Sequence, residues 1–233
     1  MTTISRRASR SALQRGLSLV ELMVGAAISL FIAAAGAALL AGNLRENRAL
    51  MLESRLTHDL RTAADLVSRD LRRAGYWGSA TEGVWATGAT HVAANPYAAL
   101  APAAAASDAI SFSYSRDATE NQRVDANEQF GFRLRRGAIE MQLGTDNWQA
   151  LTDAGTLKIT AFSLAPSVQD ISLESFCAQP CAVGSPATCP PHQQVRSFGL
   201  VITGQLATDA HLSRSVQSQV RLRNDPVIGA CSV

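Results

Sequence analysis

The longest apolar stretch of the chain lies near its amino terminus. Residues 17–42 contain a single charged side chain, that of Glu21, in 26 positions. A helix of this length rises about 39 Å, whereas the hydrocarbon core of a bilayer is about 30 Å thick. The pattern therefore predicts a membrane-spanning helix over residues 17–42.

After this stretch the apolar positions become periodic. They recur every three or four residues, at Ala49, Leu52, Leu56, Leu60, Ala63, Val67, Leu71 and Ala74. This spacing is typical of an amphipathic helix with one apolar stripe. We therefore expect the membrane helix to continue as an amphipathic half over residues 43–75 and to end at Gly75, because glycine favours helix termination.

Beyond the helix, residues 76–107 show no sustained period and are expected to form an irregular connection. Alternation with a period of two then begins, in runs that start at Ile110, Phe130 and Ile139. Such alternation predicts strands, and Arg136-Gly137 between the second and third runs predicts a tight hairpin. Further strands are expected at 157–164, 195–206 and 215–223.

These elements predict the fold class. An antiparallel sheet with one apolar face must cover that face, and the amphipathic helix offers a stripe of suitable length. The expected architecture is α+β, with a long amino-terminal helix packed on an antiparallel sheet that forms a head over residues 108–233.

Charge orients the predicted membrane helix. Residues 1–16 contain four arginines and no acidic residue, which places this leader in the cytoplasm and the head outside it. A cleaved secretory signal also begins with a basic region, but its apolar part is only about 7–15 residues long. Without the leader, 21 − 4 = 17 basic side chains face 19 acidic ones, so no nucleic-acid partner is expected.

The cysteines also indicate an oxidising compartment. Cys177, Cys181, Cys189 and Cys231 are even in number and all lie late in the chain. This favours disulfides over a metal site, since the spacing lacks the paired C-x2-C elements of zinc ribbons. Four cysteines allow three pairings.

Glu21 stands out chemically because an acid within a membrane helix costs about 2.5–3.5 kcal/mol on insertion scales. It is close enough to the start of the stretch to reach the interface. It could alternatively pair with a cation inside the membrane, where the low dielectric strengthens the attraction between opposite charges.

The string RGLSLVELM at residues 15–23 resembles the processing site of type IV prepilins. The resemblance implies that a prepilin peptidase cuts between Gly16 and Leu17 and methylates the new amino terminus. It also implies an acid at the fifth mature position, which is Glu21 here. The new Leu17 amine of one subunit is then expected to pair with Glu21 of its neighbour during assembly.

Two further strings refine the resemblance. DLRRAGYWG at residues 70–78 is similar to the helix end of the PilW-type minor pilins, and VRLRN at residues 220–224 looks like the last strand of minor pilins. The family implies a pilin-like fold and a subunit of the inner membrane with a periplasmic head, which can be carried into the pilus at the cell surface. Its partners would be minor and major pilins, the prepilin peptidase, the membrane and the assembly platform. It also suggests that Cys231 pairs with one of the other three cysteines.

Two alternatives stay open at this point. A minor pseudopilin of type II secretion shares the leader, helix and sheet, and a membrane-anchored secreted enzyme belongs to another class. No nucleophile elbow, HExxH, P-loop or GxGxxG motif occurs, so we expect no catalytic residue and no cofactor. Asp117, Glu120, Asp125 and Glu128 could ligate calcium, but their spacing differs from an EF-hand loop, and we expect no metal site.

Overall fold

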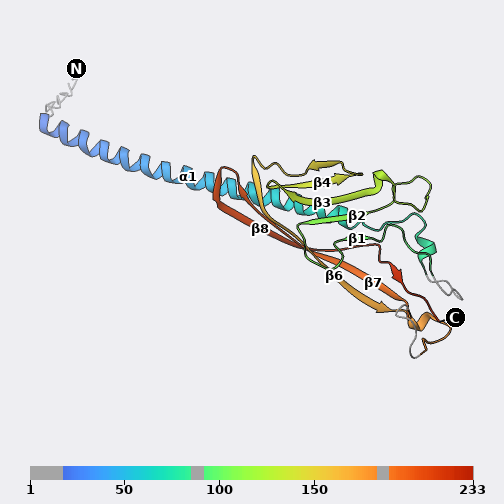
Figure 1. The fold of residues 1–233 in the computed structure, drawn as a ribbon. Helices are drawn as coiled ribbons and strands as arrows, with labels where there is room; N and C mark the ends of the chain where they lie inside the picture. Colours follow the sequence, from blue (N-terminus) through green and yellow to red (C-terminus); the bar gives the residue numbers. More distant parts are fainter. Residues whose placement is uncertain (1–17, 85–91, 183–188, 233) are drawn as a thin grey trace, which may run out of the picture. The chain divides into compact units, whose positions relative to one another are not determined.

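A computed structural model of the chain describes residues 18–84, 92–182 and 189–232. The chain forms two compact units, residues 1–51 and 52–233. The first described element, α1 (Leu19–Leu71), is a 53-residue helix that contributes to both units (Figure 1). In the first unit, every described residue is exposed.

In the second unit, α1 buries the stripe that the periodic pattern predicts. Leu56, Leu60, Ala63, Val67 and Leu71 are at most 3% exposed. Ala64 and Ser68 widen this buried face, because neighbours one position away share part of a helix face with an apolar stripe. The predicted amphipathic helix is therefore confirmed from Leu56 onward.

The first sheet is antiparallel and follows the order of the chain. It consists of β1 (Leu100–Ala101), β2 (Ala109–Ser113), β3 (Gln129–Arg135), β4 (Ala138–Leu143) and β5 (Trp148–Ala150). The predicted hairpin joins β3 to β4, where Arg136 has φ 51° and Gly137 has φ 77°. Two consecutive positive φ values are the mark of the tight turn that suits a two-residue hairpin.

The second sheet contains the longer strands. Its order is β6 (Leu157–Ser172), β7 (His192–Leu206) and β8 (Asp209–Arg221), and β9 (Val227–Ile228) pairs with one end of β7. All of these pairs are antiparallel. Among the described residues, three short 3-10 helices accompany the sheets: η1 (Ala80–Gly83), η2 (Ala126–Glu128) and η3 (Glu174–Phe176).

One hydrophobic core joins α1 to both sheets. The first sheet contributes Phe112, Phe130 and Phe132, and the second contributes Phe198 and Ile202. Figure 1 shows the second-unit part of α1 running along the two sheets. The fold is thus α+β and pilin-like, with the helix on antiparallel sheets. The strands divide between two sheets. Alternation does not predict this division, because it identifies the buried face of each strand but not the strands with which it pairs.

The helix also ends earlier than expected. It stops at Leu71, and Arg73, Ala74 and Tyr76 then donate backbone hydrogen bonds to the carbonyl three residues earlier. Gly75 adopts φ 74°, and its N–H donates to the Ser113 carbonyl of β2 at 2.8 Å. Tight turns of this kind satisfy backbone groups that a helix end leaves unpaired.

Candidate functional site

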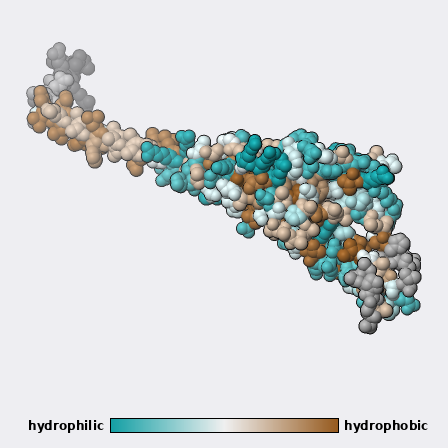
Figure 2. Space-filling model, in the orientation of Figure 1, coloured by the Kyte–Doolittle hydropathy of each residue, from teal (hydrophilic) through white to brown (hydrophobic). Residues whose placement is uncertain are grey.

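Residues 19–42 of α1 form an apolar surface. Leu19, Leu30, Phe31 and Leu39 are each more than 70% exposed, and Figure 2 shows the amino-terminal stretch of the helix in brown and tan, with teal hydrophilic residues further along it. α1 is the one helix in the described part of the chain that is long and apolar enough to cross a membrane. Exposed apolar area of this extent marks contact with lipid or with other proteins.

Glu21 lies in the first turn of α1. The Leu22 N–H donates to the Ser18 carbonyl, so helical hydrogen bonding begins just ahead of Glu21. Within the described residues no ion pair involves Glu21. Gly16 and Leu17, the expected cleavage positions, lie outside the described residues, so the pairing of Glu21 with a Leu17 amine stays a prediction.

The two strings that resemble minor pilins meet in the second unit. The Asn224 side-chain amide donates to the carbonyls of Arg73 and Ala74, at 3.4 and 3.1 Å. The Arg223 N–H donates to the Arg72 carbonyl at 3.4 Å. The end of VRLRN therefore satisfies carbonyls at the carboxyl end of α1, which a helix leaves without internal partners.

Arg196 of β7 fixes this junction from inside. Its guanidinium is buried and donates to the carbonyls of Ala98 and Asn224. Burial lowers the pKa of Arg196, and the charge of Asp225 partly offsets this effect. Sequence reasoning missed this residue, because an arginine within a strand gives no signal that it is buried.

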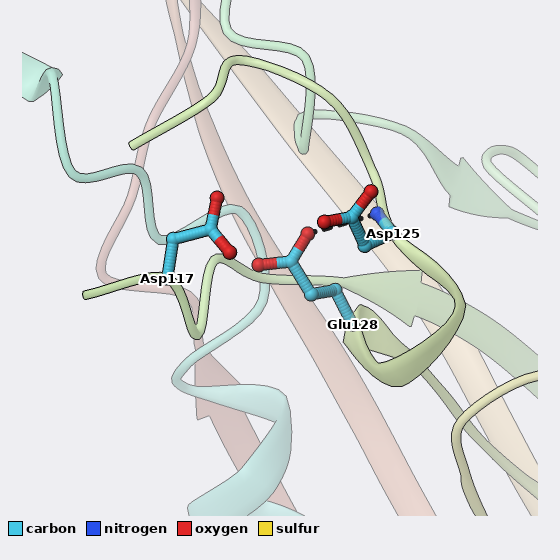
Figure 3. Close-up of side chains that lie close together, drawn as sticks. All are labelled: Asp117, Asp125 and Glu128. Carbon is cyan, nitrogen blue, oxygen red and sulfur yellow. Dashed lines mark hydrogen bonds between the residues drawn. The ribbon is translucent and has the colours of Figure 1, made fainter. Parts of the chain in front are cut away.

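The four acidic residues considered for calcium form a structural network. Asp117, Asp125 and Glu128 lie close together (Figure 3), with ligand oxygens within 4.8 Å of one another. Glu128 is fully buried and accepts from the backbone N–H groups of Arg116 and Asp125, at 2.6 and 2.9 Å. Hydrogen bonds thus already engage its carboxylate, as buried polar groups require.

Tyr97 links this network to the connection after α1. Its hydroxyl lies 3.1 Å from carboxylate oxygens of both Glu120 and Glu128. Burial and these carboxylates raise the pKa of Tyr97. Burial alone would raise the pKa of Glu120, but N–H groups of Gln122 and Gly78 donate to it and lower that pKa below its usual value. Near neutral pH, Tyr97 therefore keeps its hydroxyl proton and the Glu120 side chain stays an ionised carboxylate.

Sequence reasoning missed the role of this network, although a signal was present. Asp125 and Glu128 form a capping box around η2. In that motif an acid three residues after a capping side chain reaches back to its backbone. The spacing of the pair therefore favours a structural role for these carboxylates.

The cysteines form two disulfides. Cys177 joins Cys231 across 54 positions, and Cys181 joins Cys189 across 8. Ser232 adds hydrogen bonds to the carbonyls of Gln179 and Pro180. The carboxyl terminus is thus attached to the segment that follows β6. Resemblance implied a partner for Cys231 among the other three cysteines, and the structure selects Cys177.

A long apolar helix packed on antiparallel sheets defines a pilin-like protein. The family model described as PpdB, prepilin peptidase-dependent protein B, matches residues 49–222. This match covers more than half of the chain, and the chain belongs to that family. Comparison with curated proteins and with solved structures found no significant match.

Proposed function

We propose that the chain is a minor pilin of the PilW type, a subunit that helps to initiate or assemble a type IV pilus by packing and not by catalysis. The observation that carries the proposal is α1 itself. It exposes an apolar surface over residues 18–42 and buries a stripe in the second unit. One helix thus offers an apolar surface for assembly in its first part and packs against the sheets in its second part. The PpdB family match supports a pilin-related protein.

Processing comes first in this proposal. The prepilin peptidase cuts between Gly16 and Leu17, within the RGLSLVELM string, and methylates the new amino terminus. Before this cut, the arginines of the leader hold the amino-terminal end of the precursor in the cytoplasm. The chain then spans the inner membrane once, with its disulfide-bearing second unit in the periplasm, an oxidising compartment.

Assembly follows from the exposed apolar helix. When the subunit leaves the bilayer, side chains such as Leu19 and Phe31 need a new apolar environment, since exposing them to water would be unfavourable. The corresponding helices of other minor and major pilins provide it, and the inner-membrane assembly platform brings the subunits together. The Glu21 carboxylate and a neighbouring Leu17 amine set the register.

A minor pseudopilin of type II secretion is the second candidate. The family description specifies dependence on prepilin peptidase, and pseudopilins share that processing. The helix end at residues 70–78 favours the PilW type, because that string resembles PilW-type proteins.

Deletion of the gene separates the two candidates. We expect the deletion strain to lose most of its surface pili while its secreted proteins are unchanged, because a subunit that acts by packing is needed only in its own assembly. The measurements are sheared pilus yield and the protein profile of the medium, with the wild-type gene restored as control. Normal piliation together with loss of secreted proteins would instead assign the chain to type II secretion.

A further inference from the structure

The second half of β6 is a sheet edge that lacks a partner on one side. In the sheet order β6 is terminal, and it pairs with β7 along its whole length. On its other side, an isolated bridge joins Leu164 to Ser107. Beyond that bridge, residues 167–172 are all exposed.

The direction of the backbone groups along this edge follows from the hydrogen bonds that its neighbours make. The N–H and carbonyl of Leu164 both bond to Ser107, away from β7. Because successive residues of a strand point to alternate sides, Pro166, Val168, Asp170 and Ser172 share this outward direction. The hydrogen bonds of β7 agree with this direction. Arg196 and Gln194 of β7 lie opposite Val168 and Asp170. Their backbone groups bond away from β6, to Leu222 and Pro226.

Val168 and Asp170 therefore present backbone donors and acceptors to the edge. Among the described residues, no hydrogen bond reaches the backbone of either residue from that side. Native proteins usually cover or blunt such an edge, because it invites another strand to pair. Pro166 blunts only the beginning of this edge. Val168 and Ile171 are 46% and 43% exposed and add apolar area on opposite faces of the strand.

A cavity adjoins the edge on the face that carries Val168. Its volume is about 330 Å³, and its walls include Leu100, Pro166, Val168 and Phe198. A strand added beside β6 would place every second side chain on this face. One of those side chains would lie next to the cavity.

We propose that the edge of β6 from Pro166 to Ser172 binds an extended segment of a neighbouring pilin-like subunit by strand addition. Main-chain hydrogen bonds to Val168 and Asp170 supply affinity, and an apolar side chain of the segment enters the cavity. This inference rests on the proposed function, because it takes the partner from the same assembly. In the assembly, the second unit would then contact a neighbouring subunit, in addition to the contacts between the apolar helices.

A second copy of this chain fits the edge less well. Two-fold pairing of residues 166–172 with themselves sets Val168 opposite Asp170, and an apolar side chain then faces a carboxylate. Pro166, which has no N–H, is set opposite Ser172 at both ends, and one hydrogen bond is lost each time. A different subunit is free of both defects.

Site-specific photo-crosslinking tests the contact in cells that assemble the full-length protein. The photoreactive residue p-benzoylphenylalanine replaces Asp170, with Gln217 of β8 as matched control because β8 is the other terminal strand of the sheet. The co-produced pilins of the same assembly each carry a distinct epitope tag. We expect Asp170, and not Gln217, to yield an adduct with one tagged pilin, mapped by mass spectrometry to a single extended segment.

Three outcomes would overturn the inference. Equal adducts at Asp170 and Gln217, or none at either, exclude a contact specific to this edge, and an adduct with another copy of this chain identifies the wrong occupant. If the strain still makes pili, the proposed function survives that failure. A chain that never enters a pilin assembly would instead remove the proposed function itself.

Proline substitution provides a second test. Val168→Pro removes an outward N–H but no bond to β7, and proline is tolerated at such edge positions. One lost hydrogen bond should weaken co-purification with the tagged pilin by about two- to tenfold while the unfolding temperature stays near that of the parent. Gln169→Pro removes an inward bond to β7 and should lower the unfolding temperature. Undiminished co-purification of Val168→Pro would contradict strand addition.

Discussion

Glu21→Ala is expected to abolish incorporation into the pilus while processing and membrane insertion stay intact. Insertion gains from the loss of an acid within an apolar span. In the assembly, however, the Leu17 amine of the neighbour would remain buried without its anion. Breaking a buried pair in this way costs about 3–5 kcal/mol, which corresponds to a drop in association of more than about a hundredfold.

Two variants serve as controls for this result. Glu21→Asp keeps the charge but shortens its reach by one methylene, so its assembly should be intermediate. Glu46→Ala removes another exposed carboxylate of α1, beyond the apolar stretch, and should assemble as the parent does. The measurements are co-purification with other pilins and surface pilus yield. If Glu21→Ala assembles as well as the parent, Glu21 is an interfacial charge and the pairing mechanism is wrong.

The disulfides carry the second large effect. Replacing both Cys177 and Cys231 with serine opens a loop of 54 positions, which should lower the free energy of unfolding by about 4 kcal/mol in the chain-entropy model. For a chain of this size the unfolding temperature would fall by roughly 8–16 °C. The loss arises because the unfolded chain regains the freedom that the cross-link removes.

The other disulfide provides the matched control. Cys181 and Cys189 close a loop of only 8 positions, so their double serine variant should lose about 2.5 kcal/mol. Thermal unfolding of the oxidised full-length protein in detergent compares the three proteins. A larger loss from the short loop than from the long one would show that loop entropy does not set the stability of this region.

The helical elements could be predicted well because burial leaves a strong period in the sequence. The stripe from Leu56 to Leu71 repeats every three or four residues and is buried as expected. The hairpin at Arg136-Gly137 could be predicted equally well, because few residue pairs accept two positive φ values. Both features depend on residues that are close together in the chain, so the local sequence is enough to predict them.

Features that depend on distant partners could not be predicted. β5 has three residues and β9 has two, too few to show a period. The second half of β6 is exposed at most positions, and its polar and apolar residues do not alternate, so a period of two does not reveal it. The helix end at Leu71 depends on a hydrogen bond between Gly75 and Ser113, and pairing of distant segments of this kind is not written in local sequence.

In the candidate site, too, features with a local sequence signal could be predicted and features that depend on distant contacts could not. The apolar surface and the lone charge of Glu21 are visible in the sequence, because membrane helices have a distinctive composition. The choice of Cys177 as partner of Cys231 is not, since it depends on β9 pairing with β7 near residue 192. Arg196 and Tyr97 were missed because burial of a polar side chain is a property of the packed fold.

The amino-terminal residue of the mature protein decides whether the chain is processed as a prepilin. We expect protein from normal cells to begin at Leu17, and protein from cells without prepilin peptidase to begin still within residues 1–16. Sequencing or intact mass of the purified chain from both strains makes the comparison. A mature chain that begins beyond Glu21 in both strains would show ordinary signal removal and contradict the assignment of this protein as a processed pilin subunit.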